Sequence, residues 1–498
     1  MTDAQPEDEN PIPGHGVVLR ARNGDVIRYD PSGLTLRLSD RVLADIALRL
    51  PQRDSAAPRA GAAAAVPPAD LPDGIDAWDA RQDGAWLRFT ARLPGAQGVR
   101  GFRRHVDGGA IIAESNGPLL GLLGLGGPRA ALANPGGAEF PHHILAPADD
   151  IGAVGHAGIE DAAPIDRLEP LREMTHEALV AQTVLHWRLA EHGALPLFLT
   201  RVETDASVTA AELACGKAVD NLLMAASNLR AAADLMGKRA KVLAVTLDFA
   251  LEDHSDTPAA YRDGMLAVMG AVSDGLWKLG FDRPLFVVRF ESGLPDCAPQ
   301  AALDGQWELA WNHGDHRLIQ SAPAYMFARD AYDRPTDTAR LQHAEMTASA
   351  IAEAATWKCP VLHLAELEGT TLRVAARAAG PLVLDADDPF GAGHGFHLTG
   401  CDNGAAIERV SIAADDPQTV LIHLDRAPNG AYLRLAYACA GPVNAGALRD
   451  TWSLESATGA SLHRWALPAH LPITGGRCAA APRPRKPSGK ARPDDDDD

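Results

Sequence analysis

The sequence predicts an α/β fold in which a doubly wound parallel sheet is flanked by two smaller β-rich regions. Two observations lead to this prediction. From about residue 108 to residue 368, short apolar runs typical of buried strands alternate with segments of helical periodicity. After Glu368 the helical pattern stops, and short β-like runs follow one another with turn residues between them.

The strands expected in the parallel sheet are nearly continuous in apolar residues, because helices cover both faces of such a sheet. The clearest are 241–249 and 284–290. Apolar residues that recur along one stripe predict helices, which we place at 168–192, 210–236, 261–279 and 336–357.

The two ends of the chain are predicted to form separate β units. Residues 1–72 combine β-like runs at 17–21, 25–29 and 34–38 with a linker rich in Ala and Pro at 51–72. The α/β domain takes 73–368, with a first strand at 86–93. A small β-sandwich is expected over 369–468, and 469–498 is expected to be a charged, disordered tail.

Length and charge narrow the classes of function. A chain of 498 residues has room for two or three domains, and a formal charge of −19 disfavours nucleic acid and anionic membranes as partners. No apolar run could insert across a bilayer, and the acidic start lacks the apolar core of a secretory signal. The six cysteines are scattered, so we expect a protein made in the cytoplasm, or a particle assembled there and released by lysis.

The most informative segment for chemistry is 108–117, which reads Gly-Gly-Ala-Ile-Ile-Ala-Glu-Ser-Asn-Gly. Its apolar run predicts a buried strand that presents Ser115 at the rim of the sheet, where ligands bind in α/β folds. Far along the chain, His343 opens a helical run. An imidazole can take the proton of a serine hydroxyl, which is otherwise a weak nucleophile. A turn serine and an exposed helix histidine are the alternatives.

Four segments carry a resemblance through their order and spacing: Ile-Ala-Glu-Ser-Asn-Gly at 112–117, Asp-Ala-Ser-Val-Thr-Ala-Ala-Glu-Leu at 205–213, Thr-Leu-Asp-Phe-Ala-Leu-Glu-Asp at 246–253 and Arg-Leu-Gln-His-Ala-Glu at 340–345. Together they resemble the SGNH-hydrolase superfamily, in its sialate O-acetylesterase-like branch of carbohydrate esterases and phage tail or spike proteins. The resemblance covers about residues 108–468. It implies an SGNH-like, flavodoxin-like parallel sheet followed by a β-sandwich.

The resemblance implies that Ser115 is the nucleophile and His343 its base. Where the family has an aspartate three residues before the histidine, this chain has Arg340, whose charge would lower the pKa of a histidine that it faced. Asp337 and Asp333 are nearby carboxylates that could replace the missing aspartate.

The positions that correspond to the oxyanion donors and the cleft floor are altered. A glycine of the family is replaced by Asp205 or Ala206, beside Ser207, and a carboxylate near a developing oxyanion is unfavourable. The family's Gln-Gly is replaced by Ala250 and Leu251, which removes an amide and adds bulk. Glu252 stands where the family has its glutamate. Alternatively, Glu252 is one of several charged residues in a solvated loop.

Three further clusters are weaker. The pairs His142–His143 and Asp149–Asp150, and the turn 311–316 with two histidines and an aspartate, do not have a spacing that converges on an ion, so we expect no metal and no cofactor. The glycine-rich segment 121–127 lacks the Lys-Ser or Lys-Thr of a phosphate loop, and we interpret it as a flexible loop beside Ser115.

Two functions remain open, and the sequence does not decide whether the chain is an enzyme. The altered positions favour an esterase-derived binding or structural protein, such as a component of a phage-like spike or tail. Its partner would be a cell-surface polysaccharide or an acetylated glycan, with homo-oligomerisation or particle assembly. The alternative is an active carbohydrate O-acetylesterase in which Ser115 attacks the acetyl carbonyl and His343 acts as base.

Overall fold

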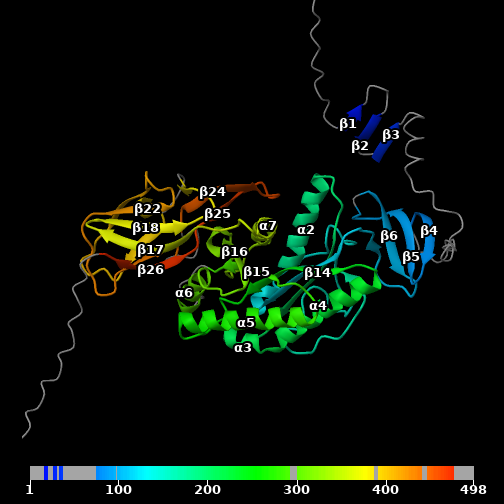
Figure 1. Ribbon diagram of the computed structural model, residues 1–498, viewed down its shortest axis with the longest axis horizontal. Coiled ribbons are helices and arrows are strands. Elements are labelled where there is room, and N and C mark those ends of the chain that lie inside the picture. The colour runs from blue at the N-terminus through cyan, green and yellow to red at the C-terminus, as the bar shows by residue number, and fades with distance from the viewer. Residues whose placement is uncertain are drawn as a thin grey trace, which may run out of the picture. The chain divides into compact units, whose positions relative to one another are not determined.

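The computed structural model describes residues 16–20, 26–30, 33–37, 75–96, 98–291, 300–385, 391–439 and 446–475. The chain divides into two compact units, Met1–Ala64 and Ala65–Asp498. In the first unit, β1 (Gly16–Arg20), β2 (Val26–Asp30) and β3 (Gly33–Arg37) form an antiparallel sheet in sequence order (Figure 1). They coincide with the three β-like runs of the sequence. The linker at 51–72 and residues 476–498 of the expected tail lie outside the described residues.

A seven-stranded sheet runs through the second unit in the order β11-β10-β13-β8-β14-β15-β16. Only β11 (Leu168–Pro170), at one edge, is antiparallel to its neighbour. The parallel strands are β8 (Leu119–Gly126), β10 (Ile144–Pro147), β13 (Leu197–Thr204), β14 (Ala240–Asp248), β15 (Leu285–Phe290) and β16 (Arg317–Pro323). Without the short β10, their order is that of a flavodoxin-like sheet, 2-1-3-4-5.

Helices cover both faces of this sheet (Figure 1). On one face, α4 (Lys217–Leu235) and α5 (Pro258–Lys278) share a hydrophobic core with β8 and β14, and α3 (Ala210–Ala214) and α6 (Gln300–Leu309) pack against α5. On the other face lie α2 (His176–Ala190) and α7 (Asp337–Ala352). A threonine hydroxyl accepts a backbone N–H at the start of α2, α3, α5 and α7, which fixes where each begins.

The expected helices are present with shifted ends. The range 168–192 holds β11, then β12 (Glu173–Met174), which pairs with β9 (Asn134–Pro135), and only then α2. The range 210–236 is two helices, because Cys215 ends α3 and Gly216 caps α4. His343 lies in the second turn of α7 and is buried there, so it does not open the helix.

The central strand β8 is the largest difference from the sequence-based expectation. The segment 121–127, interpreted as a flexible loop, is mostly the buried part of this strand. A Cβ at Gly121 would clash with Leu229 of α4, and one at Gly124 would clash with Glu177 of α2. Glycine therefore lets a helix approach β8 closely from each face. Leucine and glycine give little of the β-branched enrichment by which strands are recognised, and this explains the error.

A four-stranded antiparallel sheet precedes β8. It consists of β4 (Ala77–Asp83), β5 (Trp86–Arg92), β6 (Val99–His105) and β7 (Ile112–Ala113), in sequence order. Its apolar side joins the core that holds α4, and Trp86 Nε1 donates to Leu235 O at 3.1 Å. The strand expected at 86–93 is β5. The apolar run before Ser115 is β7, which belongs to this antiparallel sheet and not to the parallel one.

The C-terminal region consists of two sheets in which most neighbouring strands are antiparallel. Their strand orders are β20-β23-β26-β17-β18-β22-β21 and β19-β24-β25. The expected start of the C-terminal region after residue 368 is too late, because its strand β17 begins at Val361. The expected start of the tail at residue 469 is too early, because strand β26 lies within that range. The strands are β17 (Val361–Glu368), β18 (Thr371–Arg377), β19 (Leu382–Leu384), β20 (Phe396–Thr399), β21 (Ile407–Ile412), β22 (Thr419–Leu424), β23 (Arg434–Tyr437), β24 (Leu448–Glu455), β25 (Ser461–Trp465) and β26 (Ala469–Thr474).

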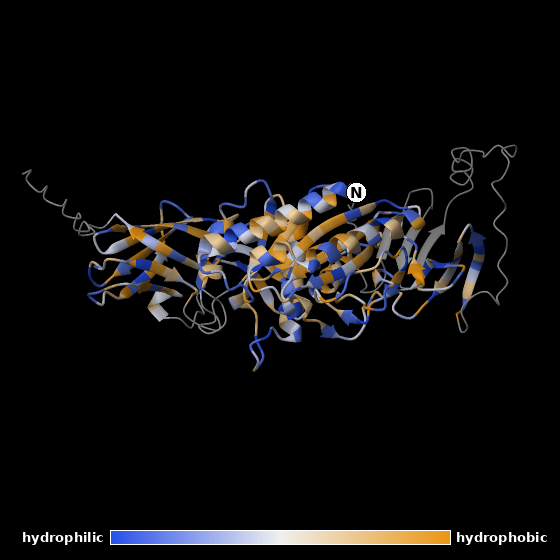
Figure 2. Ribbon diagram, turned by 90° about the horizontal axis from the view of Figure 1, so that it is seen from below, coloured by the Kyte–Doolittle hydropathy of each residue, from blue (hydrophilic) through white to orange (hydrophobic). Residues whose placement is uncertain are grey.

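Hydrophobic residues gather along the strands of the parallel sheet, and hydrophilic residues dominate the loops around it (Figure 2). Within the described ranges, no helix combines the length and the apolar character needed to cross a bilayer.

A buried charge cluster fixes the loop after β10. The guanidinium of Arg201, on β13, is 1% exposed and pairs with Asp149 at 2.9 Å and with Glu203 at 2.8 Å. It also donates to the carbonyl of Gly152 at 2.8 Å. Both carboxylates are buried with it, so each depends on Arg201 for neutralisation.

Replacing Arg201 with methionine is expected to lower the free energy of unfolding by about 3–5 kcal/mol, because two buried carboxylates lose their partner. Urea denaturation followed by near-ultraviolet circular dichroism measures the change. The matched control is Arg172→Met, which removes an exposed guanidinium from Asp150 and Glu169 and should leave the free energy of unfolding nearly unchanged. Equal stability of the two variants would contradict the assignment of Arg201 as a structural cation.

Candidate functional site

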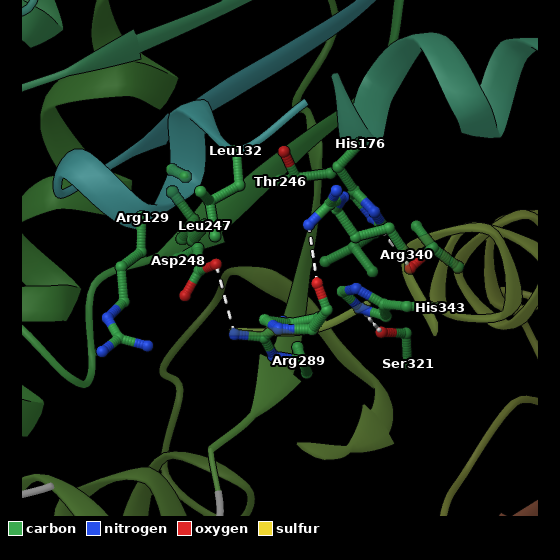
Figure 3. Close-up of a pocket in the computed structure, with 14 residues that line it drawn as sticks. Arg129, Leu132, His176, Thr246, Leu247, Asp248, Arg289, Ser321, Arg340 and His343 are labelled. Atoms are coloured by element: carbon green, nitrogen blue, oxygen red, sulfur yellow. Dashed lines mark hydrogen bonds and ion pairs between the residues drawn. The ribbon is translucent and has the colours of Figure 1, made fainter. Parts of the chain in front are cut away.

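A polar cleft opens where the carboxyl ends of β14, β15 and β16 meet α2 and α7 (Figure 3). It lies beside the point between β8 and β14 at which the strand order reverses, the usual place for ligands in open α/β sheets. The space between its walls is about 600 Å³, including the part open to solvent. Its polar lining comprises Arg129, His176, Thr246, Asp248, Arg289, Ser321, Arg340, His343 and Thr347.

A chain of alternating charges starts at the cleft, where Asp248 and Arg289 line it. Asp248, the last residue of β14, lies 3.5 Å from the guanidinium of Arg289 on β15, which also pairs with Glu291 at 3.0 Å. Glu291 in turn binds Arg329 at 2.8 Å. Burial opposes the charge of Arg289, but Asp248 and Glu291 hold its pKa above the ordinary value. Arg289 is therefore a permanent, immobile cation.

Two stacked histidines form one wall. The rings of His176, at the start of α2, and His343, on α7, lie 4.1 Å apart between centroids with their planes 23° apart (Figure 3). Nε2 of His176 is 3.1 Å from the hydroxyl of Thr347, and Nε2 of His343 is 3.5 Å from the hydroxyl of Ser321. Burial lowers the pKa of His176 to about 3, and burial with the charges of His176 and Arg289 lowers that of His343 well below its usual value. Both rings are neutral near pH 7.

Glu252 lies behind the rim. It follows β14, and its Oε1 accepts the backbone N–H of Arg129 at 3.2 Å, in the short helix η2 (Pro128–Ala131) after β8. Gly127 permits this contact, because a Cβ there would clash with the Glu252 side chain. Burial, reinforced by the negative charge of Asp248, raises the pKa of Glu252 to about 7.

Ser115 stands at the opposite edge of the sheet. It precedes β8, its carbonyl accepts a hydrogen bond from Nζ of Lys238, and Leu119 N donates to Arg239 O at 2.9 Å. Lys238 and Arg239 lead into the amino end of β14. The eight residues of β8 thus separate Ser115 from the cleft, which amounts to roughly 25 Å of extended chain. The expectation that Ser115 sits at the ligand-binding rim is wrong, and the structure does not bring Ser115 and His343 together.

Asp337 does not support the histidine either. It forms an ion pair with Arg340, and its side chain is 62% exposed. Arg340 also donates to Pro335 O and Asn134 Oδ1, which holds it at the cleft rim. Asp333 pairs with Arg329 at 3.6 Å. The contacts found around the His343 ring are instead with His176, Phe327 and Ser321.

The remaining expected site residues reach the correct edge of the sheet but not the cleft. Asp205 follows β13 and accepts hydrogen bonds at 3.0 Å from both the N–H and the hydroxyl of Ser207, so it shapes a turn. Ala206, Ser207 and Leu251 do not line the cleft.

Histidines of the two weaker clusters, 142–143 and 311–316, contact backbone carbonyls through their rings. His142 and His143 hydrogen-bond through Nδ1 to Ile111 O and Pro196 O, and burial lowers the pKa of His143 to about 4. His313 Nδ1 lies 2.8 Å from the carbonyl of His316. Among the described residues, no group of three or more His, Cys, Asp or Glu side chains is arranged to hold a metal ion.

Sequence reasoning missed Arg129, His176, Asp248, Arg289 and Ser321 as parts of one site. A signal for two of them was present. Arg289 interrupts an apolar strand near its carboxyl end, and Asp248 ends the longest apolar strand. A charged residue at that end of a buried strand faces the ligand-binding edge of a parallel sheet.

The neutral histidines make the fold sensitive to acid. Their pKa values are lower in the folded state than in the unfolded chain, so stability present above pH 6.5 is lost as the pH falls toward 3. In His176→Gln, the loss of unfolding free energy between pH 7 and pH 4 should be smaller by about 2–3 kcal/mol. Urea denaturation at a series of pH values measures this. The exposed His254→Gln should keep the wild-type profile, and an unchanged profile in His176→Gln would count against a buried neutral ring.

Glu252 has the opposite pH dependence. Its pKa is about 7 when folded and 4.5 in the reference state, so its contribution is present below pH 4.5 and is lost as the pH rises through 7. Relative to wild type, Glu252→Gln should therefore gain about 2–3 kcal/mol of stability between pH 4.5 and pH 8. The difference in unfolding free energy at the two pH values measures this, and a difference independent of pH would refute it.

Similarity to known proteins is found among solved structures. No protein-family model matches the chain, and no curated protein matches it. Among solved structures, a carbohydrate acetylesterase from Xanthomonas citri is similar with a TM-score of 0.46 and 14% identity, over 76% of this chain and 86% of the esterase. The N-terminal part of a bacterial S-layer protein, SbsC, is similar with a TM-score of 0.17 and 14% identity, over 43% of this chain and 38% of that one. Both scores are too low to support a functional assignment.

Proposed function

We propose that the protein binds a glycan in the carboxyl-edge cleft and does not hydrolyse esters through a serine nucleophile. The observation that carries this proposal is the turn after β8. In an SGNH-type site, a nucleophile at the rim would have to come from such a turn, yet here it reads Gly126, Gly127, Pro128 and Arg129. None of these residues has a hydroxyl or a thiol, whereas the cleft beside it is rich in fixed polar groups.

The lining suits a polyhydroxylated ligand. Asp248 offers carboxylate oxygens that accept hydrogen bonds, and the guanidinium groups of Arg129 and Arg340 donate them. A sugar hydroxyl does both, so neighbouring hydroxyls can use acceptor and donor in turn. The neutral rings of His176 and His343 add a wall that does not repel either sign of charge.

An exposed aromatic residue lies on a loop that contacts the lining of the cleft. Tyr332 is 76% exposed, and the guanidinium of Arg334 lies 5.0 Å from its ring centroid. Asp330 Oδ1 accepts the backbone N–H groups of Tyr332 at 2.9 Å and Arg334 at 3.0 Å, which fixes the loop. Arg129 donates to Asp333 O at 3.3 Å, so the loop rests against the cleft lining. A pyranose ring presents a flat C–H face that such a ring can cover.

The remaining serine of the cleft does not supply the missing chemistry. Ser321 is buried, and its hydroxyl donates to the carbonyl of Val288 at 3.3 Å. Its neighbour His343, whose Nε2 lies 3.5 Å from this hydroxyl, has a strongly lowered pKa and also packs against His176 and Phe327, so it is a weak base. The active O-acetylesterase with Ser115 and His343 is therefore the less favoured function.

The proposed ligand is a cell-surface polysaccharide or an acetylated glycan, and the proposed setting is a phage-like spike or tail component assembled in the cytoplasm. The combination of several β-rich regions with an α/β domain in one chain suits a multidomain particle component, and a net charge of −19 suits neither nucleic acid nor anionic membranes.

A glycan array of bacterial surface polysaccharides, followed by calorimetry on a bound glycan, tests the proposal. Tyr332→Ala should weaken binding by roughly tenfold, which is the worth of one aromatic contact. Tyr432→Ala, which removes an even more exposed ring from the β-sandwich, is the control and should bind as wild type. With an aryl acetate, wild type and Ser115→Ala should show the same background rate. Turnover that disappears in Ser115→Ala would refute the proposal.

A further inference from the structure

A second cavity lies at the amino ends of β15 and β16, on the edge of the sheet opposite the cleft. It holds about 850 Å³, including the part open to solvent, and is thus larger than the cleft. Its walls come from α5, from the residues before β15, and from the turn that leads into β16. The cavity also contains His316, whose ring meets the edge of Phe286 at 5.9 Å between centroids.

One stripe of α5 forms the first wall. Gly270, Ser273, Asp274 and Trp277 recur at intervals of three and four residues, so they share one face of the helix. A Cβ added at Gly270 would meet no atom within 4 Å, and the absence of a side chain there keeps the wall open. Trp277 is 72% exposed, which leaves a large indole surface in water at the cavity wall.

Four charged side chains line the same cavity as the indole: Asp274, Arg283, Asp315 and Arg317. None of them forms an ion pair or a side-chain hydrogen bond with another described residue. Elsewhere in the described chain most arginines are paired with a carboxylate, as Arg201 and Arg289 are. The cavity therefore offers carboxylate acceptors and guanidinium donors that are not engaged in ion pairs, together with one exposed aromatic face.

We infer that this cavity is a second saccharide-binding site, independent of the cleft. A pyranose ring has an apolar C–H face that fits the indole of Trp277 and a rim of hydroxyls that can bind both carboxylates and guanidiniums. An amino acid zwitterion would satisfy the charges but would leave the indole uncovered. With a binding site on each edge of the sheet, one molecule can hold two points of a polysaccharide, which raises avidity without a new contact.

Saturation-transfer difference NMR with the full chain tests the inference. The probes are N-acetylglucosamine, galactose and glucuronate, with glutamate as the charged compound without a ring. We expect saturation of pyranose C–H protons by the wild-type protein. Trp277→Ala should weaken the binding of the responding sugar by roughly tenfold, and Trp277→Phe should keep most of it. Because Trp277 is exposed, its replacement should leave the thermal unfolding midpoint nearly unchanged.

Tyr332→Ala separates the two sites, because it alters only the surroundings of the cleft. Sugar binding that is lost in Trp277→Ala and kept in Tyr332→Ala supports a second site whatever the cleft binds. Three results would overturn the inference: no sugar binds the wild-type protein, Trp277→Ala binds as wild type does, or glutamate binds and the sugars do not.

Discussion

The direction of one strand governs where chemistry can occur in this protein. β8 is the central strand, and all eight of its residues are in parallel register with β13 on one side and β14 on the other. In such a sheet every carboxyl end points to the same edge, and the residues before β8 are held at the other edge. Ser115 and the cleft are therefore separated by the length of the strand, and loop movement of ordinary size cannot close that distance.

The carboxyl edge of the sheet is lined by fixed polar groups. Asp248, Arg289, Glu291 and Arg329 form a continuous line of opposite charges, and burial makes Arg289, Glu291 and Arg329 dependent on their neighbours. The stacked histidines are kept neutral in the same surroundings. Such a lining can orient hydrogen-bonding groups of a ligand, and the ring contacts of His343 among the described residues are with His176, Phe327 and Ser321 rather than with a carboxylate.

The sequence predicted the fold where burial leaves a strong pattern and failed where it does not. Strands β14 and β15 were placed within one residue, because both are apolar runs covered by helices. β8 was missed because glycines that admit Leu229 and Glu177 weaken the strand pattern. That single error moved Ser115 to the wrong edge. β7, a short strand of a separate antiparallel sheet, was taken for the strand that carries the nucleophile.

The candidate site was predicted only in part, for a related reason. His343 was identified from a local pattern, whereas its partners His176 and Ser321 come from an earlier helix and a later strand and are joined only by the fold. The ion-pair partner of Asp337 was also missed. Asp337 was expected near His343 from its spacing, but the guanidinium of Arg340 is nearer and binds it. Long-range contacts of this kind leave no periodic trace in one sequence.

Reaction with a fluorophosphonate probe, followed by mass-spectrometric mapping of the modified residue, tests the central claim most directly. The probe reacts with serines that a base activates. If the sheet separates Ser115 from His343, and if Ser321 is held by its backbone contact, native protein at pH 7–8 should show no modification of either serine above that of the denatured chain. Stoichiometric modification of Ser115 or Ser321 in the native protein would contradict the account.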